Sequence, residues 1–235
     1  MQPPMTGRAR QIAPVRTFAV PRRRVGMSGA GVAFALACSL LAGCSLLGGG
    51  NQRQSSTIYA PEPRAATDPA WPSADWQLTI SPTSAARMID SLRISVRPTP
   101  AEIQVYKGAS WSKPPTQMLE DSILRTLEDS GRLRAVARQG RGIEGDYRLV
   151  MDLRRFEADY AGAAVPSATI EVNAKLLHPV DRRAVASRTF LVTEPAVGTA
   201  VPEVVSAFDT ALAEASRQIS GWVLASGAQH EQQPH

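Results

Sequence analysis

Residues 116–131 read TQMLEDSILRTLEDSG, and this stretch decides how the rest of the chain can fold. Its apolar residues recur at intervals of three and four, which places them along one side of an α-helix. They are Met118, Leu119, Ile123, Leu124 and Leu127. The charged residues between them fall on the opposite side, and Gly131 is placed to end the helix. The pattern predicts an amphipathic helix whose apolar side must be covered by another layer.

The segments on both sides of this helix alternate between apolar and polar residues, as half-buried β-strands do. The alternating segments are 76–80, 91–96 and 103–106 before the helix, and 147–154, 170–176 and 184–193 after it. In the last segment Phe190 and Arg188 fall on the same face, which predicts a β-bulge near Arg188.

A second amphipathic helix is predicted over 202–224, where apolar residues again recur at three and four. They are Val204, Val205, Phe208, Leu212, Ala215, Ile219 and Trp222. The order strands, helix, strands, helix predicts an α+β fold. We expect a two-layer sandwich in which two amphipathic helices lie on one face of an antiparallel-rich mixed sheet. The other face then needs water, a partner protein or a second copy of the chain.

The N-terminus has the composition of an export signal. Arginines at 22–24 precede an apolar run over 29–41, which is too short to span a bilayer and is typical of a signal-peptide core. The run ends in Leu41-Ala42-Gly43-Cys44, which resembles the bacterial lipobox. We therefore predict a lipoprotein-type signal peptide over 1–43 and acylation of Cys44 with fatty acids such as palmitate. The alternatives are ordinary cleavage that leaves Cys44 as a free thiol, or Cys38 as the lipidated residue.

Composition divides the rest of the chain into three parts. Residues 44–73 are rich in Gly, Ser, Gln, Pro and Ala, which predicts a lipidated flexible tether. Ile58, Tyr59 and Trp71 are apolar, so packing of part of this segment against the domain is the alternative. The folded domain is predicted over 74–226 and a disordered tail over 227–235. Ser45 follows the lipidated cysteine, and by resemblance to the sorting rule of Gram-negative lipoproteins we expect the outer membrane, facing the periplasm.

The charge of the chain argues against nucleic acid as a partner. The chain has 26 basic and 21 acidic residues and a sequence pI near 9.7. Six of the basic residues and none of the acidic ones lie in 1–43, so the chain without its signal peptide is nearly neutral. A nucleic-acid-binding protein needs a basic body or stripe, which is missing here.

Four patterns look catalytic but lack the context that their chemistry requires. The glycines at 140, 142 and 145 have dinucleotide-binding spacing, but a strand follows them where a helix should begin, which predicts a turn. Ser110 and Lys113 have the spacing of penicillin-interacting enzymes without the later motifs. His178 precedes a proline, which predicts an exposed loop residue. Asp152 and Glu157 could act as acid and base only if they converge. We therefore predict no catalytic residue, no cofactor and no metal ligand.

Several segments together resemble one protein family. They are Leu92–Pro98, Tyr106–Leu119, Leu127–Val136, Asp146–Leu149 with Phe156 and Glu157, Ala186–Phe190 and Ala207–Trp222. With the lipobox before them, their order and spacing resemble the ABC-type transport auxiliary lipoproteins, relatives of the PqiC lipoproteins, over roughly residues 76–224.

The resemblance implies a function without catalysis. Members of this family accompany MCE-domain lipid transporters and their ABC permease and ATPase. The implied role is an auxiliary or docking component of lipid transport between the two membranes, held at the outer membrane by Cys44. A periplasmic carrier that holds lipid in its own cavity is the alternative, and a hydrolase is a weaker one.

Overall fold

The computed structural model describes residues 56–180 and 183–233, which belong to one compact unit, Gln54–His235. The predicted signal peptide over 1–43, Cys44 and the first part of the predicted tether lie outside the described residues. The described residues form one nine-stranded sheet and two helices. This confirms the predicted α+β class.

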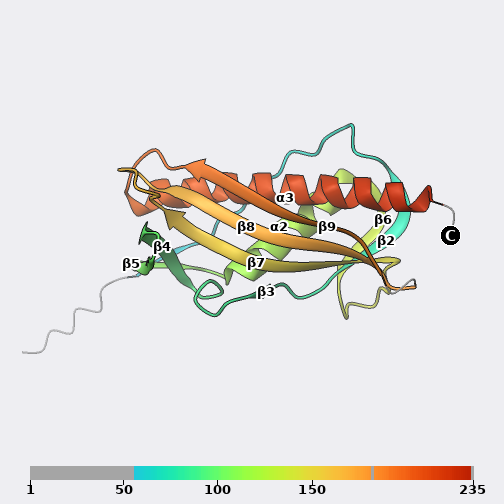
Figure 1. Ribbon diagram of the computed structural model, residues 1–235, viewed down its shortest axis with the longest axis horizontal. Coiled ribbons are helices and arrows are strands. Elements are labelled where there is room, and N and C mark those ends of the chain that lie inside the picture. Colours follow the sequence, from blue (N-terminus) through green and yellow to red (C-terminus); the bar gives the residue numbers. More distant parts are fainter. Residues whose placement is uncertain (1–55, 181–182, 234–235) are drawn as a thin grey trace, which may run out of the picture. The chain divides into compact units, whose positions relative to one another are not determined.

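Three long antiparallel strands form one side of the sheet: β7 (Tyr147–Asp159), β8 (Ser167–His178) and the edge strand β9 (Arg183–Pro195) (Figure 1). The predicted alternation is present, since residues such as Leu149 and Val172 are fully buried beside half-exposed neighbours. The bulge lies at Val185 and not at Arg188, because pairing with β8 is regular from residue 186 onward. Arg188 shares a face with Phe190 because the two residues are two apart in a regular stretch of strand. The Arg188 guanidinium packs 4.9 Å from the centre of the Phe190 ring.

The other edge of β7 pairs with three strands in succession, all parallel to it. They are β2 (Ala74–Ile80), β3 (Ser84–Ala85) and β4 (Arg93–Thr99). The sheet forks at this edge, because β2 continues to β6 (Leu133–Arg138) while β4 continues to β5 (Glu102–Trp111) and β1 (Thr57–Tyr59).

The predicted mixed sheet is therefore confirmed, but antiparallel pairing predominates only among the long strands. The pairs β1–β5, β2–β6, β2–β7, β3–β7 and β4–β7 are parallel. Alternation along a strand shows which side chains face the core, but it carries no information about the direction of the neighbouring strand.

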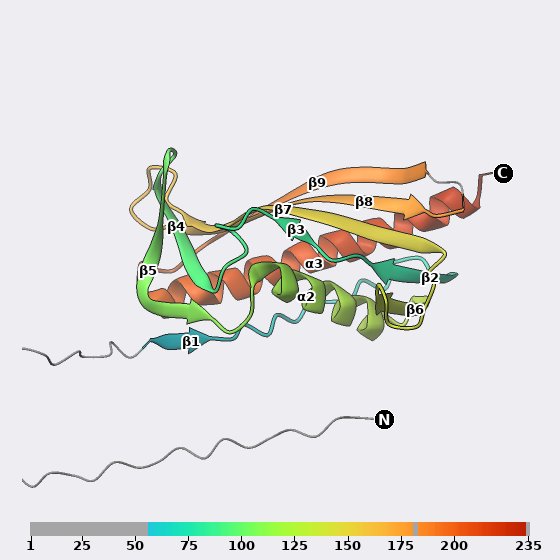
Figure 2. The ribbon, with the colours of Figure 1, turned by 90° about the horizontal axis from the view of Figure 1, so that it is seen from below.

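Helices α2 (Pro115–Ser130) and α3 (Val201–Glu231) lie on the same side of β7, β8 and β9 (Figure 2). Helix α3 packs along β8 and β9, and α2 packs against α3 and β6. The predicted end of α2 is confirmed: Gly131 has φ of 59°, a left-handed conformation that glycine adopts without steric cost.

The core between sheet and helices is aromatic near the start of α3. Phe208 stacks on Phe156 with ring centres 4.8 Å apart, and Trp111 meets both rings edge-on. All three side chains are at most 2% exposed. Phe190 is buried as well, and its ring centre lies 5.6 Å from that of the partly buried Trp222.

The predicted tether over 44–73 is wrong for its second part, because residues 57–73 pack along the domain. The Ser112 N–H donates to the Tyr59 carbonyl at 2.8 Å, next to the β1–β5 pair. Trp71 is 8% exposed and rests on Gly221 of α3, where a Cβ would lie 2.6 Å from the indole nitrogen. Figure 1 shows this segment running along α3 before it enters β2.

The predicted disordered tail over 227–235 is also wrong in part, because α3 continues to Glu231. Gly227 is buried against Trp76, and a Cβ on this glycine would lie 2.3 Å from the ring. With its 31 residues, α3 is about 46 Å long at 1.5 Å per residue. Neither described helix combines the length and apolarity that a membrane span requires.

Candidate functional site

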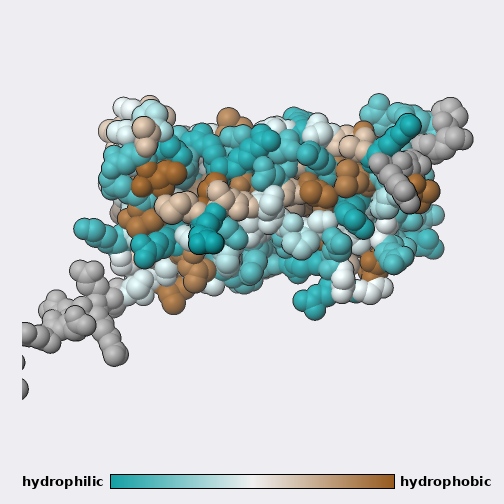
Figure 3. Space-filling model, turned by 60° about the horizontal axis from the view of Figure 1, so that its bottom comes forward, coloured by the Kyte–Doolittle hydropathy of each residue, from teal (hydrophilic) through white to brown (hydrophobic). Residues whose placement is uncertain are grey.

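The outer face of β7, β8 and β9 carries mainly polar side chains. Asp152, Glu171 and Lys175 lie on this face at half-buried or exposed positions, so water can solvate it. In Figure 3, apolar residues form a broken row along the molecule between hydrophilic ones. The exposed large apolar residues are scattered over several elements, among them Ile58, Leu92 and Leu191.

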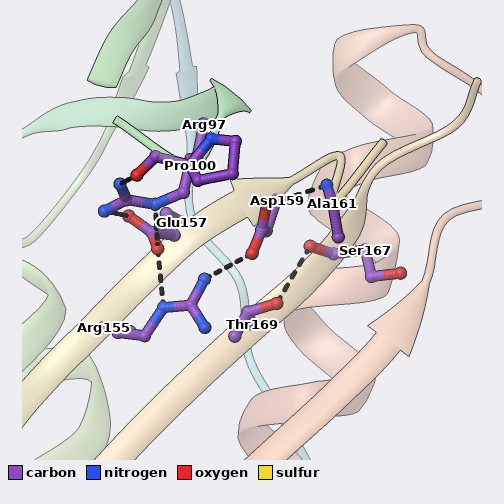
Figure 4. A network of polar contacts seen from close by, with 8 residues as sticks. All are labelled: Arg97, Pro100, Arg155, Glu157, Asp159, Ala161, Ser167 and Thr169. Atoms are coloured by element: carbon purple, nitrogen blue, oxygen red, sulfur yellow. Dashed lines mark hydrogen bonds and ion pairs between the residues drawn. The ribbon is translucent and has the colours of Figure 1, made fainter. Parts of the chain in front are cut away.

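A network of four charged side chains joins β4 to β7 (Figure 4). Arg97 donates twice to Glu157, at 2.8 Å from Nε and 2.9 Å from Nη2, and Arg155 Nε donates to the same carboxylate at 2.7 Å. Arg155 also pairs with Asp159, and Arg97 Nη1 donates to the Pro100 carbonyl at 2.8 Å. The hydrogen bond to Glu157 raises the pKa of Arg97 above its ordinary value. Because the four charges balance, the network braces the β4–β5 hairpin and leaves no charge for a ligand.

A cluster of aromatic and histidine rings lies at the C-terminal end of α3. The Tyr147 hydroxyl lies 2.7 Å from His230 Nδ1 and donates to Glu231 Oε1 at 2.7 Å. The Tyr147 ring centre is 4.7 Å from that of Trp76 and 5.1 Å from that of His178. These contacts hold the last turns of α3 against the start of β7.

A hollow of about 550 Å³ lies next to this cluster. Its wall includes Trp76, His178 and Glu231 together with Asp146 and Arg134. The indole nitrogen of Trp76 is buried and has no hydrogen-bond partner among the described residues. The hollow is therefore lined by both charges and aromatic rings, a composition suited to binding rather than to packing.

Two further hollows share Arg148 and Pro179. The larger one, about 660 Å³, lies under the turn that joins β6 to β7 and includes Thr79 and Glu144. The smaller one, about 280 Å³, is lined by Arg148, Leu177, His178, Pro179, Arg183 and Ala184. We call this smaller space the arginine hollow. The start of β7 and the end of β8 thus carry three adjoining surface hollows, a concentration that no local motif of the sequence predicted.

The hollows and the N-terminal strand β1 lie toward opposite ends of α3. Tyr59 of β1 pairs with Trp111, which packs 5.2 Å from Phe208 near the start of α3. His230 of the ring cluster lies 22 residues further along the same helix, a separation of about 33 Å.

The motifs with catalytic spacing have structural roles. Residues 140–145 form the predicted turn before β7, and Gly140 and Gly142 have positive φ. Ser110 lies in β5, where no helix begins, and Lys113 pairs with Asp121 at 2.7 Å. The expectation for His178 is wrong: it ends β8 and packs against Tyr147 and His230, because strand pairing outweighs the local turn signal of the following proline.

The two carboxylates that could act as acid and base have separate partners. Asp152 accepts from Ser84 at 3.0 Å, whereas Glu157 is enclosed by Arg97 and Arg155. Across residues 56–180 and 183–233, no group of three or more His, Cys, Asp and Glu side chains is arranged to hold a metal ion. Cys44 lies outside these ranges, so its lipidation stays a prediction.

Comparison with known proteins gives one family and one close structure. The sequence model of the family described as "ABC-type transport auxiliary lipoprotein component" matches residues 57–220. The crystal structure of a Xanthomonas campestris protein of the DUF330 family is 54% identical, with a TM-score of 0.72, and the match covers 75% of this chain and all of that one. An uncharacterized protein of known structure is 12% identical with a TM-score of 0.56, covering 72% of this chain and 99% of that one, which shows the fold alone. None of the curated proteins matches the chain.

Proposed function

Because the chain belongs to the family of ABC-type transport auxiliary lipoprotein components, we propose that it is the non-catalytic docking component of an MCE-type ABC lipid transporter. In this proposal Cys44 is acylated and holds the domain at the outer membrane, facing the periplasm. The end of α3 that carries the three hollows meets the MCE-domain protein, while the permease and ATPase act at the inner membrane.

The observation that carries the proposal is the separation between β1 and the hollows. Thirteen residues lead from Cys44 to Thr57, a span of roughly 20 Å as a flexible chain and at most about 45 Å when taut. The β1 end is therefore held near the membrane. The ring cluster lies about 33 Å further along α3, where it can reach a partner that extends across the periplasm.

The packing of residues 57–73 makes this orientation more definite than a long free tether would. Trp71 is buried against Gly221 of α3, and the Ser112 N–H donates to the Tyr59 carbonyl at the other end of the segment. The chain that leads from the lipidated cysteine is therefore fixed to α3 through a packed segment. The relaxed span of roughly 20 Å between Cys44 and Thr57 is shorter than the distance of about 33 Å along α3, so the orientation with the β1 end toward the membrane is favoured.

A non-catalytic role agrees with the charges of the described residues. The most buried carboxylate, Glu157, is enclosed by two guanidinium groups, and Lys113 is paired with Asp121. General acid, base and nucleophile roles require groups that are free to meet a substrate and a proton acceptor. In this proposal the ATP is hydrolysed by the partner ATPase alone.

The carrier alternative requires an apolar cavity between sheet and helices. That space is filled by Trp111, Phe156, Phe208 and their neighbours. The large hollows are at the surface and have charged walls. The structure therefore favours docking over storage of a whole lipid within the domain.

Affinity purification of the tagged full chain from its own membranes in mild detergent tests the proposal. Mass spectrometry should identify an MCE-domain protein together with its permease and ATPase. A Cys44→Ser chain serves as the matched control and should lose both membrane association and the transporter. Recovery of lipid without those proteins would overturn docking in favour of the carrier. Sizing of the same preparation measures whether the chain self-associates through the open edge of β9.

A further inference from the structure

The arginine hollow has a positive charge that the described residues do not balance. Arg148 and Arg183 both line it, and none of the carboxylates in residues 56–180 and 183–233 does. Neither arginine forms an ion pair with another described residue. Arg148 Nε is also buried without a hydrogen-bond partner in the described part of the chain. Burying part of a guanidinium in this way is unfavourable unless an acceptor from outside completes the site.

The other residues that line the arginine hollow indicate what kind of ligand carries that acceptor. Leu177, Pro179 and Ala184 give the hollow an apolar side, and Val180 next to it is 81% exposed. A ligand that uses both sides carries an anionic group and an apolar part. Each guanidinium group can donate two hydrogen bonds to one phosphate. A phosphate between two arginines therefore fits this hollow better than a monatomic anion does.

The larger hollow beside it is suited to a different part of the same ligand. It shares Arg148 and Pro179 but contains Glu144, which repels a second anion. The glycines of the turn line it and can supply backbone groups, and Thr79, whose hydroxyl donates to the Tyr147 carbonyl at 3.3 Å, can supply an acceptor oxygen. A neutral polar group, such as the glycerol of a lipid headgroup, matches this lining.

We propose that the arginine hollow binds the phosphate group of an anionic lipid at the end of the domain that meets the transporter. This rests on the proposed function, because a docking component at that position lies where lipid passes. Free phosphate offers the same anionic chemistry without the apolar part. An acidic surface of the partner protein is the competing occupant.

Native mass spectrometry of the full-length lipoprotein in mild detergent tests this site with three probes: phosphatidylglycerol, phosphatidylcholine and inorganic phosphate. The wild-type protein should retain phosphatidylglycerol in preference to phosphatidylcholine. The double variant Arg148→Gln/Arg183→Gln should retain at least about tenfold less, which corresponds to 1.4 kcal/mol. The pair Arg87→Gln/Arg93→Gln removes the same charge at exposed positions on other elements and should leave retention unchanged. The single Arg183→Gln change at an exposed position tests the site if the double variant folds poorly.

Three results would overturn the proposal. Equal retention in the double variant and the wild type shows that the arginines do not hold the lipid. Binding of inorganic phosphate as tight as that of phosphatidylglycerol shows that the apolar side contributes nothing. Loss of the MCE partner with unchanged lipid retention assigns the arginines to a protein contact. Loss of lipid from the double variant with the partner retained supports the site. If the wild-type chain recovers no MCE-domain protein but still retains phosphatidylglycerol, the proposed docking role fails and the lipid site stands.

Discussion

Replacement of Gly227 by alanine tests the packing that holds the end of α3. A Cβ at this position would lie 2.3 Å from Trp76 Cζ2 and 2.9 Å from Cε2, whereas carbon atoms pack at about 3.5–4.0 Å. Trp76 is 5% exposed and packs against Tyr147 with ring centres 4.7 Å apart, so a Cβ at position 227 requires the ring to move by about 1 Å.

Two opposing effects set the magnitude of this change. Overpacking costs about 1–3 kcal/mol, whereas exchange of glycine for alanine within a helix stabilises by about 1 kcal/mol. We expect Gly227→Ala to lower the free energy of unfolding by about 1 kcal/mol in the wild-type chain. In a Trp76→Leu background the obstructing ring is absent, and the same change should raise the free energy of unfolding by about 1 kcal/mol.

Urea unfolding followed by far-ultraviolet circular dichroism measures both values without relying on the fluorescence of Trp76. Ala225→Gly, at an exposed position of the same helix, calibrates the helix preference and should cost about 1 kcal/mol in both backgrounds. If Gly227→Ala stabilises both backgrounds equally, the contact with Trp76 does not constrain α3 and the ring cluster is not a rigid wall of the hollow.

Three other changes test separate parts of the account. Glu157→Gln should lower the free energy of unfolding by about 2–4 kcal/mol, somewhat less than for a fully buried pair because the two arginine side chains are 21% and 28% exposed. A decrease under about 0.5 kcal/mol, measured by urea unfolding, would refute the bracing role. Burial raises the pKa of the Asp209 carboxyl in the folded chain above its ordinary value of 3.8. The ionised carboxylate at neutral pH therefore lowers the free energy of unfolding, and protonation at low pH removes this loss. Asp209→Asn should therefore exceed the wild type in stability near pH 7, and the difference should shrink as the pH falls toward about 4; a difference constant with pH would contradict this. Cys44→Ser should move the protein from the membrane to the soluble fraction, and continued membrane association would refute lipidation at this cysteine.

Most of the regular elements were predictable because their side-chain spacing is a local property. The apolar residues of 116–131 define one side of a helix, and the alternation over 147–154 and 170–176 defines the faces of β7 and β8. Gly131 ends α2 as expected because the left-handed conformation favours glycine.

The remainder depends on contacts between residues far apart in the sequence. Residues 57–73 have the composition of a linker, and their packing is shown by the fit of Trp71 on Gly221 and the pairing of β1 with β5. The last turns of α3 have the composition of a disordered tail, but the contacts of Tyr147 with His230 and Glu231 hold them in the helix. The arginine hollow combines Arg148 with Arg183, which lie on different strands, so no spacing in the sequence could indicate it.

The central claim is that the C-terminal end of α3 meets the transporter while the β1 end stays near the membrane. A photo-reactive amino acid placed at Val180, which is 81% exposed beside the hollows, or at Ile58, which is 67% exposed in β1, tests this directly in cells. We expect illumination to cross-link the MCE-domain protein to the Val180 position and not to Ile58. A cross-link from Ile58 with none from Val180 would contradict it.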